Sequence, residues 1–463
     1  SILNIGGTSG ITTLIATGTD NTVSFTGGAQ TVNNGNYENL VLSGSGAKTL
    51  QTLTYTVYKN LTLSGTVTTA TVVGFAVGGN LNIGNGTTFT AAGFDLTVTG
   101  TTAIGGGSSG SLVINSATGI KTFVGLVTVN AGANFTNTAA NEAVTFRGGI
   151  TNAGTFSAGT GIYTFDTNDQ ALTGTFAIPN VTVTGVNLTN NNTLTVSTAL
   201  SGTAGTLTQA ANATLNIGGT SGITNLTAAN TGNTVNYNGA AQTVKTTIYY
   251  NLTFSGSNTK TFIANTTVIN DISIASGVNS SLGTGLVHMA NRLILAGTAQ
   301  AANTYAGQNG VGAGVVNTTY FTATTGILNT LTNFWTGTTD TNWHVTTNWS
   351  KGTVPTASVP AIIPNVTNKP IISASAVCSA LTINIGSSVT LNGTNTLTIS
   401  GNLSNAGTLT CNSGVVSLTG AFTNTGTVNV NTGTVNYSGA AQSVLGIIYY
   451  HLPLSGSGTK TLT

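Results

Sequence analysis

Apolar and polar residues alternate along short stretches throughout the chain. In one of them Leu397 and Ile399 are apolar, whereas Thr398 and Ser400 are polar. Alternation with a period of two predicts a half-buried β-strand. Gly-Asn, Asn-Thr-Gly and Ser-Gly sequences separate these stretches and predict turns, because Gly and Asn adopt positive φ angles at low cost. Since Thr, Val, Asn and Gly are poor helix formers, the pattern predicts an all-β chain.

These strand-and-turn units repeat with a short period. Residues 397–401 recur as 416–420 and again, after a step of equal length, as 435–439. Near the start, residues 37–44 recur as 58–65 with a similar spacing. A unit of this size cannot enclose its own core, so it buries its apolar face by stacking on copies of itself. The period predicts a parallel β-helix, a β-solenoid, of about 19–21-residue coils, and we expect it to be right-handed by analogy with other β-helices.

A longer module occurs three times. Its first copy contains Ala29-Gln30-Thr31-Val32, followed by Tyr37 and Lys48. The same residues return over 241–260 and again over 441–460, with Ser443 in place of the threonine. A weaker echo covers residues 163–185. Tandem immunoglobulin-like sandwiches are the alternative all-β architecture, but they need about 100 residues per unit, and the short gap-free steps argue against them.

The regular pattern breaks over residues 286–370. All three tryptophans and four of the six prolines lie in this interval. We interpret it as irregular coils or a lateral insertion packed on the rod. The predicted organisation is therefore β-helix repeats over residues 1–285, an irregular part over 286–370, and β-helix repeats over 371–463 that continue beyond the sequence given.

The chain carries few charges for its size. Only 4% of its 463 residues are charged, its formal net charge is +2, and 39% of its residues are hydrophobic. Disordered chains combine low hydrophobicity with high net charge, so disorder is not expected. The small net charge gives no electrostatic reason to bind nucleic acid, and no apolar run reaches the roughly 18 residues of a membrane-spanning helix. We therefore expect no nucleic-acid partner, no membrane insertion and no cofactor.

Three passages resemble the very long cell-surface β-helix proteins that Bacteroidota-type bacteria secrete. The first is the repeated module, seen at residues 29–50. The second covers residues 297–321 and ends in Thr-Tyr-Phe, and the third covers residues 334–365 with its Phe-Trp-Thr-Gly and Ile-Pro-Asn sequences. Members of that group look like adhesins, stalks or surface filaments. The resemblance implies an extracellular, structural protein, transfers no catalytic residue, and leads us to expect sorting and anchoring segments outside this sequence.

Trp335, Trp343 and Trp349 are the first candidate site. Three clustered indole rings could form a platform on which a sugar stacks. The same rings could instead seal the irregular part against the rod, because large aromatic side chains usually dominate a core. We favour packing and keep glycan binding as the alternative.

Lysines supply two further predictions. Glu38 and Lys59 occupy equivalent places in successive units, so they should stack on neighbouring coils and form a cross-coil ion pair worth at most about 1 kcal/mol. Four other lysines each precede Thr and then Leu or Phe, and we expect them in solvated turns. A row of basic sites for an anionic glycan is the less favoured interpretation of these four: Lys48, Lys121, Lys260 and Lys460.

Catalysis and metal binding find little support in the sequence. β-Helix lyases and hydrolases need clustered carboxylates, and of the eight acidic residues only Asp166 and Asp169 are close together. We expect a polar turn there rather than a calcium site. The three histidines show no zinc or triad spacing. Cys411 takes a valine position and should be a buried hydrophobe, and its spacing from Cys378 does not favour a disulfide.

The sequence thus predicts a non-catalytic extracellular surface protein, either the rod of a filament or the stalk of an adhesin. Its expected partners are further copies of itself in fibres, or surface glycans. Ice binding through Thr-x-Thr rows ranks lower, because matched coils read Thr398, Ser417 and Asn436 at one position. A polysaccharide lyase or hydrolase also ranks low, because the acid cluster is missing.

Overall fold

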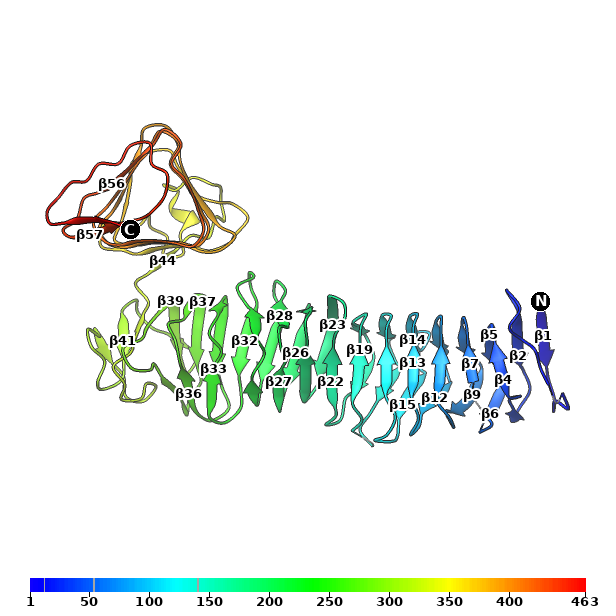
Figure 1. Cartoon of the computed structure of the whole chain (residues 1–463). Coiled ribbons are helices and arrows are strands. Elements are labelled where there is room, and N and C mark those ends of the chain that lie inside the picture. The colour runs from blue at the N-terminus through cyan, green and yellow to red at the C-terminus, as the bar shows by residue number, and fades with distance from the viewer. Residues whose placement is uncertain (12, 53–54, 140) are drawn as a thin grey trace. The chain divides into compact units, whose positions relative to one another are not determined.

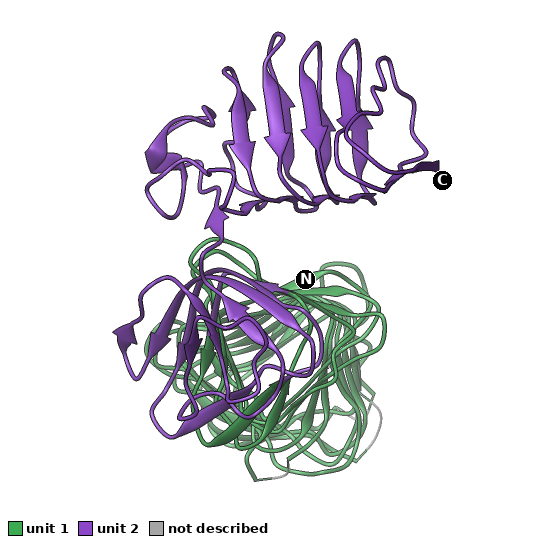
Figure 2. Cartoon of the chain, turned by 90° about the vertical axis from the view of Figure 1, so that its left-hand side faces the viewer, with its two compact units in different colours: residues 1–247, 253–261 green, residues 248–252, 262–463 purple. Residues whose placement is uncertain are grey.

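The computed structural model describes residues 1–11, 13–52, 55–139 and 141–463. Within them the chain forms short β-strands, and the one helix is a single 3-10 turn, η1 (Thr346–Asn348). In the regular coils each strand lies parallel to its counterpart in the next coil, which makes a β-solenoid (Figure 1). The chain divides into two compact units: unit 1 comprises residues 1–247 and 253–261, and unit 2 comprises 248–252 and 262–463 (Figure 2).

Three faces of stacked strands make up most of unit 1. The first face comprises β1 (Ile2–Ile5), β2 (Thr22–Phe25), β5 (Asn39–Leu42), β8 (Leu61–Leu63), β11 (Leu81–Ile83), β14 (Thr102–Ile104), β17 (Val127–Val129), β20 (Ile150–Asn152), β23 (Gln170–Ala177), β25 (Asn187–Asn190), β28 (Thr206–Gln209) and β31 (Asn225–Thr227). The second face comprises β4 (Gly35–Tyr37), β7 (Tyr55–Val57), β10 (Phe75–Val77), β13 (Leu96–Val98), β16 (Lys121–Phe123), β19 (Val144–Phe146), β22 (Ile162–Phe165), β24 (Asn180–Val183), β27 (Ala199–Ser201) and β30 (Thr220–Ser221).

The third face consists of two adjoining ladders. The first ladder comprises β3 (Gln30–Thr31), β6 (Ser45–Thr49), β9 (Thr66–Ala70), β12 (Thr88–Ala91), β15 (Ser111–Ile114), β18 (Asn134–Thr136) and β21 (Thr155–Ser157). The second ladder comprises the end of β23 with β26 (Thr193–Val196), β29 (Thr214–Ile217) and β32 (Thr234–Tyr237). The two ladders meet where the rings of Phe156 and Phe176 lie 5.3 Å apart.

The predicted coil steps are confirmed by strand register. Leu40 of β5 pairs with Leu61 of β8, at the spacing of the repeat near the start of the chain. Leu397 of β50 (Thr396–Ile399) pairs with Val416 of β53 (Val415–Leu418), at the spacing of the repeat near its end. Buried and more exposed positions alternate along these strands, so the period-2 pattern of the sequence marks which side chains face inward.

Stacked side chains fill the interior of unit 1. Because parallel ladders place equivalent residues above one another, aromatic residues form continuous piles. Phe123 lies 5.5 Å from Phe146, and Phe146 lies 5.8 Å from Phe165, in three successive coils. Phe135 and Phe156 stack with ring centroids 4.5 Å apart. This packing ties each coil to the ones below and above it.

Unit 2 contains regular coils and an irregular stretch. β37 (Thr267–Ile274) and β39 (Val287–Leu295) continue the parallel pattern. Antiparallel pairings between strands then appear among the described residues, joining β39 with β40 (Thr298–Ala299) and β41 (Thr304–Ala306) with β43 (Ile327–Asn329). These pairings and η1 lie inside the interval 286–370 that the sequence marks as irregular.

Parallel coils resume at β44 (Asn333–Phe334). One face comprises β44, β45 (Ala361–Ile363), β48 (Leu381–Ile383), β51 (Leu403–Asn405) and β54 (Phe422–Asn424). Another comprises β46 (Ile371–Ile372), β49 (Ser388–Leu391), β52 (Thr408–Thr410) and β55 (Thr427–Asn429). The last comprises β47 (Ala376–Cys378), β50, β53 and β56 (Thr434–Tyr437). Viewed along their axis, these coils have a triangular outline (Figure 1).

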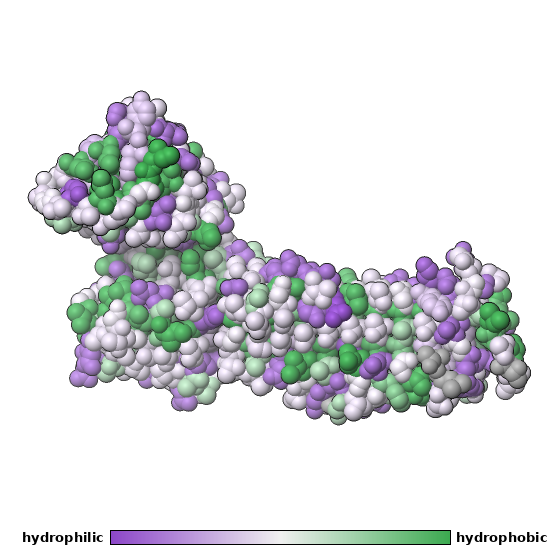
Figure 3. Space-filling view, in the orientation of Figure 1, coloured by the Kyte–Doolittle hydropathy of each residue, from purple (hydrophilic) through white to green (hydrophobic). Residues whose placement is uncertain are grey.

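Small, weakly polar residues cover much of the face that Figure 3 shows, with apolar and hydrophilic ones interspersed. At one corner of unit 1 the side-chain oxygen of Asn60 accepts from the backbone N–H of Asn80 at 3.0 Å, and that of Asn80 accepts from Thr101 N–H at 2.8 Å. Asparagine therefore links successive coils where the backbone turns.

Candidate functional site

The three tryptophans form one buried cluster. Trp335 and Trp343 are 0% exposed and Trp349 is 2% exposed. The ring of Trp349 lies 5.1 Å from that of Trp335 and 4.7 Å from that of Trp343, both edge to face. Two indole N–H groups donate to backbone carbonyls, from Trp349 to Trp343 O and from Trp335 to Asn368 O, each at 2.7 Å.

This geometry supports packing over sugar recognition. A stacking platform must offer a ring face to its ligand, and none of these three rings has an exposed one. The tryptophans instead belong to the apolar core of the coils that follow them, in one buried cluster with residues such as Ile363 and Leu381. The favoured interpretation of the tryptophans as packing residues is consistent with the structure, and the glycan platform requires surface that they do not have.

Glu38 and Lys59 stack without pairing. The backbone N–H of Lys59 donates to Glu38 O at 2.8 Å, so the two residues lie on neighbouring coils as predicted. Among the described residues, however, the side-chain ion pairs join Arg147 with Asp166 and Arg292 with Asp271. The predicted Glu38–Lys59 ion pair is absent from the structure, because equivalence along the chain fixes the backbone position and not the direction in which a long side chain extends.

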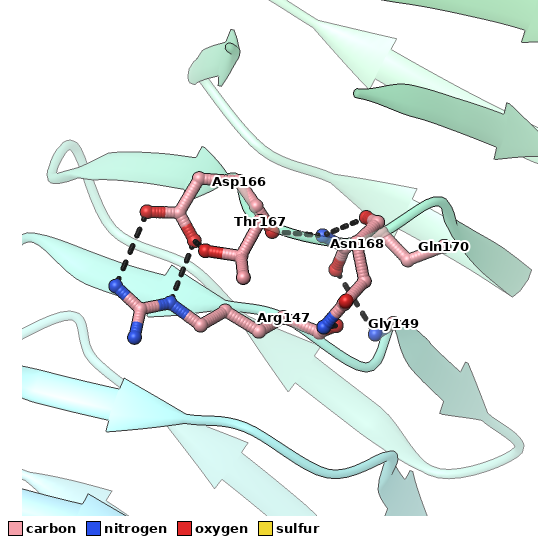
Figure 4. Close-up of polar contacts among 6 residues, drawn as sticks. All are labelled: Arg147, Gly149, Asp166, Thr167, Asn168 and Gln170. Atoms are coloured by element: carbon pink, nitrogen blue, oxygen red, sulfur yellow. Dashed lines mark hydrogen bonds and ion pairs between the residues drawn. The ribbon is translucent and has the colours of Figure 1, made fainter. Parts of the chain in front are cut away.

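An ion pair holds the turn after β22. Arg147 donates to both carboxylate oxygens of Asp166, at 2.7 and 3.3 Å, and the Thr167 hydroxyl donates to the same carboxylate at 3.0 Å (Figure 4). Burial raises the pKa of Asp166, but the hydrogen bonds from Arg147 and Thr167 outweigh it and lower the pKa overall. Asp169 accepts from the backbone N–H of Asn187 at 2.8 Å. Both carboxylates are thus already engaged, as expected for a polar turn.

The four lysines predicted to lie in solvated turns are buried or half-buried. Lys48 is 1% exposed, and Lys121 and Lys260 are 0% exposed. The prediction was wrong because a charged residue with no apparent partner in the sequence was assigned to solvent. The structure surrounds each ammonium with backbone carbonyl oxygens, which can accept its three N–H donors.

Lys260 shows the geometry of this carbonyl cage. Its ammonium donates to Gly239 O at 2.7 Å, to Ser257 O at 3.0 Å and to Ala240 O. Lys460 repeats the arrangement with the equivalent carbonyls of the third module. Burial lowers the pKa of the Lys260 ammonium, and three carbonyl partners offset part of the cost of removing it from water.

A glutamine completes the cage from below. The side-chain amide of Gln242 donates to Ile217 O at 2.7 Å and to Gly219 O at 2.9 Å in the preceding coil, and its oxygen accepts from Gly239 N–H at 2.8 Å. Gln30 and Gln442 make the matching bonds in the other two modules. The turn that starts at Gly239 is therefore held from below by Gln242 and from above by Lys260. We call this arrangement the three-coil clamp.

The three-coil clamp lies where the ladder of backbone hydrogen bonds between successive coils is interrupted. β30 is the last strand of the second face, and β33 (Gln242–Val244) begins a separate sheet with β36 (Asn258–Phe262) and β38 (Val278–Ser281). Between them lies a groove of about 500 Å³, lined by residues 200–201, 218–222 and 240–243. β3 and β57 (Gln442–Val444) are end strands in the same way. In every copy the clamp therefore bridges a coil junction that lacks one set of ladder bonds.

The sequence held a signal for the clamp. Lysine follows glutamine at the same spacing in each of the three modules, and the register pairs Gln30 with Lys48 and Gln442 with Lys460. In the weaker echo the residue paired with Gln170 is Leu188. There the Gln170 oxygen accepts from Gly149 N–H at 3.0 Å and its amide donates to carbonyls of its own turn (Figure 4).

The cysteines are free and buried. Cys378 and Cys411 form no disulfide, and burial raises the pKa of both thiols to about 12. Cys411 is 0% exposed, which confirms the prediction that it replaces a core valine. Within the described part of the chain, no group of three or more His, Cys, Asp or Glu side chains could hold a metal ion. No helix among the described residues has the length and apolarity to span a membrane.

Part of the chain matches a known family. Residues 334–446 match a family described as a domain of unknown function, DUF8693. The matched segment begins within β44 and covers the tryptophan cluster and the coils whose core it joins. No curated protein matches the chain. No solved structure matches it either.

Proposed function

We propose that this chain is a structural rod of an extracellular surface protein, either a filament segment or the stalk of an adhesin. The observation that carries the proposal is the stacking of coil on coil in register, with an apolar interior and an exterior of Thr, Ser and Asn. In such an arrangement each added coil lengthens the stack by about 4.8 Å, so a longer chain spans a greater distance. The buried tryptophans and the engaged carboxylates of Asp166 and Asp169 weigh against a glycan platform and a calcium site.

Electron microscopy of a lengthened chain tests the rod. Ala29 and Ala241 occupy equivalent places in two modules, so residues 29–240 can be duplicated in frame. The lengthened chain runs from residue 1 to Ala240 and then from Ala29 to residue 463. The duplicated segment forms about ten coils and should lengthen the particle by about 50 Å. A particle that grows equally in all directions would contradict the proposal. Antibody labelling of intact source cells tests the extracellular location.

A further inference from the structure

The third face of unit 1 differs from the second in width and charge. Its strands from β6 to β32 present two or more outward positions per coil, such as Thr88 and Thr90 on β12, or Thr193 and Thr195 on β26. On the second face most strands between β7 and β19 present one. Every outward residue of these third-face strands is Thr, Ser, Ala, Val, Asn or Gly, and their one charged residue, Lys48, is buried.

Charged residues lie at the ends of second-face strands, and one of them, Asp95, lies at the corner between β12 and β13. Asp95 directly precedes β13, Arg147 directly follows β19 and Asp166 directly follows β22. A second copy that approached the second face would have to accommodate these groups. The outward side chains of the third face are short and are held in columns by the ladder register, as in Thr193 above Thr175 and Thr214 above Thr193.

From this contrast we infer that the third face is a lateral interface for a second copy of the chain, placed face to face. The inference rests on the proposed function as a rod. Flat strand faces with short, uncharged side chains interdigitate when two sheets pack about 10 Å apart. The absence of charge removes the repulsion that keeps like proteins separate, and threonine contributes a methyl group to the contact as well as a hydroxyl.

The area of the face agrees with such a contact. Ten strands at a spacing of about 4.8 Å extend over about 48 Å. Two outward positions per strand give a width of roughly 12 Å, hence roughly 600 Å² on each copy and roughly 1,200 Å² in total. This value lies at the lower end of specific protein interfaces. Association of single chains is therefore weak and concentration-dependent, and it strengthens as more coils are added in line.

Matched charge insertions test the interface. In the first variant, Thr88→Lys and Thr193→Lys place two charges on the third face. In the control, Thr97→Lys and Thr145→Lys place the same charges on the second face. Sedimentation velocity over a range of concentrations, with electron microscopy at the highest, should show paired rods for the wild type and the control and single rods for the third-face variant. Equal far-UV circular dichroism and thermal midpoints establish that both variants fold.

A charge-swap experiment makes the result specific. A third chain with Thr88→Glu and Thr193→Glu should also stay single, and mixing it with the lysine variant should restore pairing. Pairing by the third-face lysine variant alone, equal loss in the control, or failure of the mixture to pair overturns the interface. So does a wild type that stays single at every concentration, and in that case well-formed single rods leave the proposed function intact. Compact globules would contradict the rod itself.

Discussion

Lys48, Lys121 and Lys260 show how a charged side chain is accommodated inside a nearly uncharged solenoid. Each ammonium replaces water with three oxygen acceptors, which for Lys121 are Phe94 O, Thr118 O and Gly119 O at 2.8 to 3.0 Å. Carbonyls at a tight turn have few other donors within reach. The buried lysine therefore satisfies backbone groups that would otherwise lack partners, at the cost of its own desolvation.

Replacing Lys260 with methionine should lower the free energy of unfolding by about 1–3 kcal/mol, because carbonyls of Gly239 and Ser257 lose their donor while the side-chain volume is largely kept. Urea-induced unfolding measures the change. Lys59→Met is the control, since Lys59 is exposed and its loss should change stability by less than about 0.5 kcal/mol. Equal stability of Lys260→Met and the wild type would show that the cage does not stabilise the fold.

We expect His288 to make unit 2 sensitive to mild acid. Its ring is buried against Phe262, with ring centroids 4.2 Å apart, and its Nε2 lies 3.0 Å from Leu282 O. Burial lowers the pKa of His288 from its ordinary 6.5, more than the contact with Leu282 O raises it. Between that lowered pKa and 6.5 the unfolded chain binds more protons than the folded one, so stability falls as pH drops below 6.5 and levels off below the folded-state pKa.

Thermal midpoints measured from pH 7 to pH 4 test this expectation. The wild type should lose stability over the acidic part of the range, and His288→Gln should lose less. His451→Gln, at an exposed position, is the control and should follow the wild type. Parallel curves for His288→Gln and the wild type would assign the acid response to other groups.

Strands of this chain gain their stability from neighbours above and below, and the three-coil clamp shows what happens where a neighbour is missing. β33 has no ladder partner beneath it in the described structure. The bonds from Gln242 to Ile217 O and Gly219 O take the place of backbone bonds at this junction. The division between the compact units falls within the same module, between residues 247 and 262. The clamp thus supplies cross-coil bonds at a junction that lacks one set of ladder bonds.

Gln242→Leu should loosen this junction. Lys245 follows β33 directly and reports on it, because trypsin cleaves after lysine where the chain opens locally. We expect several-fold faster tryptic cleavage after Lys245 in the variant. Gln170→Leu is the matched control: β23 has ladder partners on both sides, β20 and β25, so its cleavage pattern should change little. Unchanged cleavage after Lys245 in Gln242→Leu would mean that the glutamine does not hold the junction.

The repeat structure of the fold could be predicted from the sequence, because residues at equal steps along the chain lie above one another in the stacked coils. Leu397, Val416 and Val435 lie at equal steps along the chain and form one buried column. The site chemistry could not be predicted in the same way. The Lys48 cage consists largely of backbone oxygens, and their positions depend on how the turn at residues 27–30 folds against the next coil. The sequence gives the identity of each side chain, but it does not show in which direction the backbone carbonyl groups of a turn will point.

The whole molecule carries few charges, and the faces of its coils differ in whether charged residues lie beside them. In unit 1 the ion-paired Arg147 and Asp166 lie beside the second face, whereas the outward positions of the third face are uncharged across two ladders. A stack of coils with this surface is hydrated by hydroxyl and amide groups more than by charged groups. Its tendency to associate should therefore respond weakly to salt, in contrast to assemblies built on ion pairs.

The carbonyl cages also govern how the folded rod responds to reagents that modify amines. Acylating reagents attack the uncharged amine and must reach it, and the ammonium groups of Lys48, Lys121 and Lys260 are covered by protein. A fluorophore, biotin or surface-coupling ester applied to the native protein will attach mainly to lysines such as Lys59, which is exposed. The number of labels attached to each folded chain will then be lower than its number of lysines. The difference between the two numbers reports how many lysine cages remain closed to the reagent.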